Sequence, residues 1–154
     1  MRRTDREKDS AFALEVLRDC EYANFATVNA ADGTPYCIPV SPVLINNAIY
    51  FHCAYEGQKI ENIKKNNAVC LSAVRHTKLL PERFTTEYES AVAFGKCEII
   101  SDENETEKIM ALRAIGEKYA KSNMDNFDAH IVKYLSHTCI CKMKIEKITG
   151  KAYI

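Results

Sequence analysis

Hydrophobic and polar positions alternate in short runs along most of this chain, a pattern typical of β-strands. The strand pattern covers six segments: residues 22–29, 35–44, 48–53, 68–75, 86–100 and 138–149. Asp32-Gly33 and Asn46-Asn47 are turn signals that join neighbouring strands as hairpins. Because hairpins connect antiparallel neighbours, the pattern predicts one mainly β domain over residues 1–154. Closing its sheet into a small barrel would remove most of the exposed edges.

Apolar residues spaced three or four apart predict helices between the strands. Three helices are expected: residues 9–20, 104–121 and 128–134. Asp9 or Ser10 would cap the first of them. Ile60 and Ile63 predict one or two further helical turns within residues 58–67. The remaining long break in the pattern, residues 76–85, is predicted to be a loop.

Two features mark irregular strands. Pro35, Pro39 and Pro42 fall in a single extended segment, and proline has no N–H group to donate to a neighbouring strand. That segment is therefore expected at a sheet edge, at a bulge, or with its backbone turned toward something other than a strand. Gly95 lies within the long segment 86–100 and predicts a bend or bulge there.

Composition excludes several classes of protein. Lys plus Arg number 21 and Asp plus Glu also number 21, whereas a general nucleic-acid binder would carry a basic surplus. No run of residues approaches the roughly 18 apolar positions of a membrane span. The polar start, Met1 to Lys8, has no apolar core of a signal peptide. We therefore expect a cytoplasmic protein that binds neither nucleic acid nor membrane, and whose neutrality is compatible with self-association.

The seven cysteines do not show the spacing of a zinc site, since no C-x2-C pair is present. Cys139 and Cys141 form a C-x-C pair whose side chains would point to the same face of a strand. The favoured interpretation is that both are small buried hydrophobic residues. A metal or redox role is the alternative, and no metal site is predicted.

The segment from Ile49 to Ile63 contains the strongest chemical signal. A strand ends at Cys53, a loop with Gly57 follows, and helical turns begin near Lys59. A loop that enters a helix presents free backbone N–H groups and a positive dipole end, and this arrangement binds phosphate. The alternative is an ordinary loop with a solvated lysine. His52 leaves the strand toward the same loop, whereas His76, His130 and His137 are expected to be loop or surface residues.

A family resemblance rests on three stretches in this order: Gly33-Thr-Pro-Tyr-Cys-Ile-Pro-Val40, Ile49-Tyr-Phe-His-Cys-Ala-Tyr-Glu-Gly-Gln-Lys59 and Asn66-Asn-Ala-Val-Cys70. Their order and spacing resemble the flavin-binding split-barrel superfamily of pyridoxamine 5′-phosphate oxidase-like proteins. Within it, the chain is most similar to the 5-nitroimidazole resistance (Nim) family. The resemblance runs from Arg2 to about Met143 and implies a six-stranded antiparallel split β-barrel with flanking helices.

The resemblance further implies a homodimer that holds a flavin at the subunit interface. The implied flavin is flavin mononucleotide (FMN), with flavin adenine dinucleotide (FAD) as the alternative. The implied cofactor-binding residues are Ile38, Pro39, Val40, Ser41, His52, Ala54, Tyr55, Gly57, Lys59 and Ser90. Residues 54–59 would hold the phosphate, and the proline-bearing strand would place its backbone against the isoalloxazine edge. Ser90 would come from the second subunit. His52 is the implied catalytic residue, as a proton donor or a hydrogen-bond donor to substrate.

The implied reaction is reduction of a small nitroaromatic or related acceptor, with a reduced nicotinamide as a possible external electron donor. The chain lacks the Arg-rich pyridoxal-phosphate site of a true pyridoxamine phosphate oxidase, so that activity is not assigned. It also lacks a G-x-G-x-x-G nicotinamide motif. A flavin carrier or redox sensor without turnover is therefore the main alternative. A thiol-based sensor that uses Cys139 and Cys141 is a third.

Overall fold

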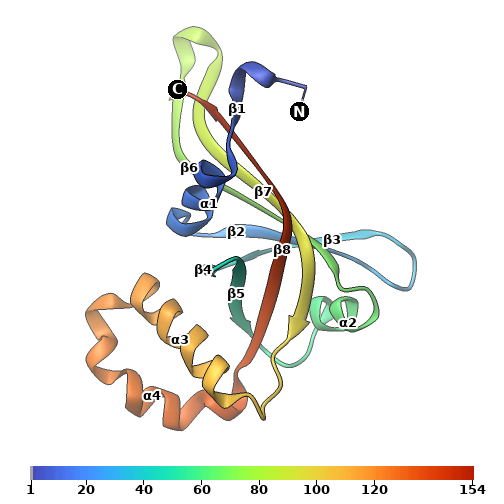
Figure 1. Cartoon of the computed structure of the whole chain (residues 1–154), viewed down its shortest axis with the longest axis vertical. Helices are drawn as coiled ribbons and strands as arrows, with labels where there is room; N and C mark the ends of the chain where they lie inside the picture. The colour runs from blue at the N-terminus through green and yellow to red at the C-terminus, as the bar shows by residue number, and fades with distance from the viewer. Residues whose placement is uncertain (1) are drawn as a thin grey trace.

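A computed structural model describes residues 2–154, and in these residues eight strands form one antiparallel sheet. The strands are β1 (Glu7–Lys8), β2 (Ala23–Val28), β3 (Pro35–Val40), β4 (Val43–Ile45), β5 (Ala48–Cys53), β6 (Ala68–Leu80), β7 (Thr85–Ile99) and β8 (Cys139–Tyr153). The α-helices are α1 (Ser10–Asp19), α2 (Gln58–Lys65), α3 (Glu105–Tyr119) and α4 (Phe127–Tyr134). Figure 1 shows α3 and α4 together at one end, with both termini near the β6–β7 hairpin at the other.

The sheet curls back on itself without closing. Its strand order is β3-β2-β6-β7-β8-β5-β4, and β1 pairs separately with β8. β3 and β4 stand at opposite ends of this order, yet only Ser41 and Pro42 separate them in the chain. This confirms the mainly β, antiparallel architecture with flanking helices. It corrects the expected six strands to eight and the closed barrel to an open one.

The proline-bearing segment explains part of that correction. Residues 35–44, expected as one strand, form β3 and β4 with a break at Ser41 and Pro42. β3 pairs only with β2, where Pro39 lies opposite Asn24, so β3 is an edge strand, which is one of the three predicted settings. The segment divides where Pro42 cannot donate a ladder hydrogen bond, and β4 instead pairs with β5.

The predicted loop over residues 76–85 is wrong for most of its length. β6 continues to Leu80, and the turn before β7 is a short 3-10 segment, Pro81–Arg83. The register with β7 shifts between Arg75 and Lys78, and His76 adopts a positive φ of 52°. The bulge accommodates the polar residues that interrupt the strand pattern, and the pairing of β6 with β7 resumes at Lys78.

The last strand and its bulge show the same influence of pairing between distant segments. β8 runs to Tyr153 rather than ending at Thr149, because its last residues pair with both β7 and β1. The predicted irregularity at Gly95 is confirmed by a register shift between Phe94 and Gly95. A Cβ atom placed on Gly95 would lie 1.9 Å from the backbone oxygen of Lys144, so only glycine permits this approach.

The helices pack on two apolar clusters. Asp9 caps α1 by accepting a 2.8 Å hydrogen bond from the Phe12 N–H, which decides between the two predicted caps. α1 and α2 pack against the main core, which lies within the curve of the sheet and includes Phe25, Phe51, Leu71 and Met143. A smaller cluster lies where α3 packs against β4 and β5. The two clusters place α2 and α3 on either side of the end of β5.

Candidate functional site

The N-terminus of α2 has the arrangement that the sequence predicts for phosphate binding. Gly57 precedes the helix with a φ of 114°, and no side chain caps the first turn. The Ile60 and Glu61 N–H groups both bond to the Gly57 oxygen. Within residues 2–154, the backbone N–H groups of Gln58 and Lys59 have no hydrogen-bond acceptor. Two donors and the positive end of the helix dipole therefore remain available to an anion.

A polar network holds this helix end against the β2–β3 hairpin. Gln58 Nε2 donates to Asn62 Oδ1 at 2.8 Å and lies 3.4 Å from Asn29 Oδ1. The buried Asn62 in turn donates to Thr27 Oγ1 at 2.9 Å. Since Asn29 directly follows β2 and Pro35 begins β3 across the hairpin, the network places α2 beside the start of the edge strand.

The loop that leads into α2 contains both acidic and aromatic side chains, and Lys59 follows it in the first turn of the helix. Lys59 is half-buried and has no carboxylate within salt-bridge distance in the described chain, whereas Ala54 and Gly57 are exposed. The Glu56 side chain is also exposed, so its charge is solvated rather than buried beside the helix end. The Tyr55 hydroxyl is occupied by protein groups, Asp102 and Lys108. Tyr55 therefore anchors the loop.

Lys108 is the buried centre of that anchor, and the sequence analysis did not single it out. Its side chain is 2% exposed, and Nζ donates to Tyr55 Oη at 2.8 Å, Asp102 Oδ1 at 2.5 Å and the Leu135 oxygen at 3.3 Å. Burial opposes the charged amine, but the hydrogen bonds to Asp102 and Tyr55 raise the pKa of Lys108. The bond from Lys108 lowers the pKa of the Asp102 carboxyl. The acidic run over residues 101–107 was the one available signal for a buried cation.

The remaining predicted contacts lie on β3 and β7. Ile38, Val40 and Ser41 are half-buried and Pro39 is exposed at the sheet edge. Ser90 donates through Oγ to the Lys151 oxygen at 3.3 Å. β2 and β6 separate Ser90 from β3 within the sheet, so one chain does not bring Ser90 to the edge strand. Ser90 therefore stands apart from residues 38–41 in a single chain.

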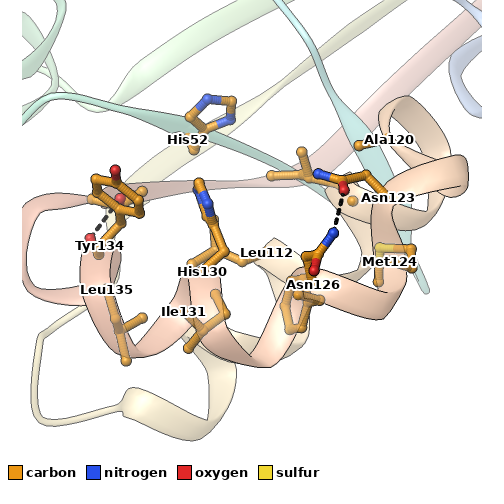
Figure 2. A pocket seen from close by; sticks show the side chains of 14 residues that line it. His52, Leu112, Ala120, Asn123, Met124, Asn126, His130, Ile131, Tyr134 and Leu135 are labelled. Carbon is orange, nitrogen blue, oxygen red and sulfur yellow. Dashed lines mark hydrogen bonds between the residues drawn. The ribbon is translucent and has the colours of Figure 1, made fainter.

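His52 lies in a different setting from Lys59. It is exposed on β5 and lines a cavity of about 270 Å³ between that strand and the α3–α4 segment. Figure 2 shows His130 projecting from α4 toward the side of the cavity where His52 lies. The His130 ring also packs against Tyr134, with 4.4 Å between ring centroids. Much of the remaining lining is apolar, from Leu112 and Ile115 to Phe127. His130, expected as an ordinary surface residue, shares a cavity with His52.

Family comparison identifies the fold. A sequence model of the pyridoxamine 5′-phosphate oxidase family matches residues 9–152. The chain belongs to this family. Its structure is similar to a candidate 5-nitroimidazole antibiotic resistance protein from Bacteroides thetaiotaomicron, with a TM-score of 0.76 and 26% identity over 94% of this chain and 84% of that one.

Two further solved structures share the fold of this family member. A FAD-binding protein from Mesorhizobium loti has a TM-score of 0.67 and 19% identity, over 97% of this chain and 98% of that chain. A FAD and haem binding protein from Mycobacterium smegmatis has a TM-score of 0.77 and 19% identity, over 96% and 73%. No curated protein matches the chain significantly.

Two further predictions concern the cellular location and the oligomeric state of the protein. Among the described residues, no helix is both long enough and apolar enough to cross a membrane. The cytoplasmic location and the homodimer stay predictions.

One surface is a candidate for the dimer interface. It is the outer face of β3, β2, β6 and β7, where the following uncharged residues lie: Ala26, Val28, Cys37, Cys70, Ser72, Val74, Val92 and Phe94. Val28, Val74 and Phe94 are each at least 39% exposed.

Proposed function

We propose that this protein binds FMN and acts as a flavin-dependent oxidoreductase of the Nim type, reducing a small nitroaromatic or related acceptor. The observation that carries the proposal is the open N-terminus of α2 beside an edge strand, in a member of the pyridoxamine 5′-phosphate oxidase family. The likeness to the Bacteroides protein supports the Nim-type acceptor. The flavin would supply the electron transfer, and the protein would bind and orient it.

The residues of the α2 end fit a flavin phosphate. The backbone N–H groups of Gln58 and Lys59 are unpaired donors in the described chain, and Lys59 adds a full charge without a carboxylate partner there. Gly57 has no side chain to obstruct an approaching anion. The space around a Cβ at this position is open, so it is the φ of 114°, rather than crowding, that favours glycine there. We therefore assign the phosphate to this helix end and FMN as the simplest occupant; FAD would extend from the same phosphate.

The edge strand β3 fits the polar rim of the isoalloxazine ring. One side of β3 has no strand partner, so backbone groups near Val40 and Ser41 are free to bond to a ligand. Pro39 and Pro42 remove donors on either side of Ser41, which limits pairing with another strand. The edge would then orient the flavin through backbone hydrogen bonds.

Dimerisation would bring the distant Ser90 to this site. Ser90 lies at the border of the neutral outer face defined above, opposite Val74 on β6. If two copies pack through that face, Ser90 of one copy approaches the flavin of the other. His52 would serve acceptor reduction as a proton donor or as a hydrogen-bond donor to the substrate.

The test of the proposed function follows the flavin spectrum of the purified full chain. We expect added FMN to bind and to be reduced anaerobically by a reduced nicotinamide, then reoxidised by a nitroimidazole. Binding without reduction or without reoxidation would favour the carrier or sensor alternative. A chain that does not bind FMN or FAD would contradict both.

Replacing Lys59 by alanine should weaken FMN binding about 10- to 100-fold, because a charge-assisted phosphate contact contributes about 1.5–3 kcal/mol. Fluorescence titration of FMN measures the dissociation constant. Lys65→Ala is the matched control, since Lys65 lies in the last turn of the same helix. Equal affinities in the two variants would mean that the phosphate binds elsewhere.

Replacing Phe94 by glutamate should shift the protein from dimer to monomer. Phe94 is 46% exposed on β7 at the border of the neutral face, between Cys70 on β6 and Lys147 on β8. A charge buried in an interface costs about 2 kcal/mol or more, or roughly 30-fold in dimer affinity. Sedimentation velocity measures the shift, and Val132→Glu is the control because Val132 is exposed on α4. A wild-type monomer would contradict the proposed interface.

A second candidate function is haem binding in the His52 cavity. Two imidazoles in an otherwise largely apolar cavity are the residue types that hold haem iron. The fold it shares with the Mycobacterium FAD and haem binding protein gives a precedent. Haem titration followed by visible absorbance tests it: loss of the bound spectrum in His52→Ala or His130→Ala would support it, and no bound spectrum in the wild type would exclude it.

A further inference from the structure

Three of the seven cysteines gather at one point of the sheet, although they are far apart in the chain. Cys53 ends β5, and Cys139 and Cys141 begin β8. Cys53 lies directly opposite Cys139 in the β5–β8 pairing, and Cys141 is two residues further along the same face. Each of the three Sγ atoms lies within 4.8 Å of the others, and Cys53 Sγ is 3.8 Å from Cys141 Sγ.

These distances match the spacing of a thiolate metal site. With metal–sulfur bonds of about 2.3 Å, neighbouring sulfurs in a trigonal or tetrahedral site lie about 4 Å apart. Small rotations of the side chains would bring three sulfurs at 4.8 Å or less onto one ion. Disulfide-bonded sulfurs, by contrast, lie about 2 Å apart. The cluster is therefore already near the geometry of shared coordination.

The surroundings of the cluster suit an anionic metal centre with an entry path. Cys139 and Cys141 are buried, whereas Cys53 is half-buried and adjoins the exposed Ala54. Lys108 lies at the same end of both strands, since its Nζ bonds to Tyr55, two residues after Cys53, and to the Leu135 oxygen, four residues before Cys139. A buried ammonium there would offset part of the negative charge of three thiolates.

We propose that Cys53, Cys139 and Cys141 form a three-thiolate site for a soft metal ion of the d10 class, such as Zn²⁺, Cd²⁺ or Cu⁺. Soft thiolate ligands select these ions over Mg²⁺ or Ca²⁺. This site is separate from the α2 end that would hold the flavin phosphate. The bound ion would cross-link β5 to β8 and fix the start of the loop at residues 54–57.

The test uses Cd²⁺ as the probe with the reduced full chain under anaerobic conditions. We expect an ultraviolet thiolate-to-Cd²⁺ charge-transfer band that saturates at one ion per chain. Cys53→Ser should weaken Cd²⁺ binding by about 100-fold or more, because even the partners of metal ligands contribute 10- to 100-fold. Cys53 is the preferred position because it is half-buried, so serine there preserves folding.

Cys37→Ser is the matched control, since Cys37 lies on β3 outside the cluster, and its loss should leave the band unchanged. Alkylation of wild-type thiols, mapped by mass spectrometry, gives a measurement that needs no variant. Bound Cd²⁺ should slow the alkylation of Cys53, the half-buried member of the cluster, and leave the reactivity of Cys37 unchanged. A band lost in Cys37→Ser but retained in Cys53→Ser, or no selective protection of Cys53, would overturn the proposal.

Discussion

Replacing Gly95 by alanine is expected to destabilise the protein by about 3 kcal/mol or more, at the upper end of what overpacking costs. The new Cβ would lie 1.9 Å from the Lys144 oxygen and 3.0 Å from the Lys144 carbonyl carbon. These are backbone atoms of the neighbouring strand, so no side-chain rotation relieves the clash. β7 and β8 would have to separate at their bulge. Urea denaturation followed by circular dichroism measures the change in the free energy of unfolding.

Gly116→Ala provides the contrast for this first prediction. A Cβ on Gly116 would meet Met124 Sδ at 2.7 Å, but that atom belongs to a flexible side chain. Alanine also favours a helix by about 1 kcal/mol over glycine, which offsets some of the strain in α3. We therefore expect a change near zero. If the two alanine variants were equally stable, the close approach of Gly95 to β8 would be incorrect.

Replacing Lys108 by methionine is expected to destabilise the protein by about 2–3 kcal/mol. Methionine fills a similar volume but loses the hydrogen bonds to Tyr55, Asp102 and the Leu135 oxygen. The effect stays below that of a fully buried broken ion pair, because the Asp102 side chain is 65% exposed and regains water. Chemical denaturation measures the loss, with Lys121→Met as a control at an exposed position.

The hydrogen bond between Lys108 and Asp102 also makes the free energy of unfolding depend on pH. This bond lowers the pKa of Asp102 in the folded protein, so the folded state holds this carboxylate charged at pH values where the unfolded chain binds a proton. The stabilisation is present above the unfolded carboxyl pKa of about 3.9 and is lost as pH falls through the lower folded value. Lys108→Met should therefore lose less stability than the wild type as the pH falls below about 4. An identical acid dependence in both proteins would contradict the coupling.

The parts of the fold that were predictable depend on neighbours in the chain. Asp9 caps α1 through a residue three positions away, and the Asn46-Asn47 turn joins adjacent strands. Prolines remove donors wherever they occur, so an edge position was one of the three settings predicted for the segment with Pro39, and the sheet order confirms it for β3. Gly95 indicated a bulge because only a residue without Cβ allows a backbone atom so close.

The errors lie where distant segments pair. The polar residues 76–78 are typical of a loop, but β7 is long enough to pair beyond a bulge and extends β6 to Leu80. Pairing with β7 and β1 likewise draws residues 150–153 into β8. Local patterns did not reveal these contacts, because the energy of a strand comes largely from its partner.

For the candidate site, the sequence alone determined the α2 entry with Gly57 and Lys59, because strand, glycine and helix start are adjacent there. Only the tertiary structure decided which distant groups join it or stand apart. Packing of α3 brings Lys108 under the loop, the pairing of β5 with β8 places Cys53 opposite Cys139, and α4 brings His130 to the cavity that His52 lines. The physical reason is that a curled antiparallel sheet makes neighbours of strands nearly 90 residues apart, such as β5 and β8.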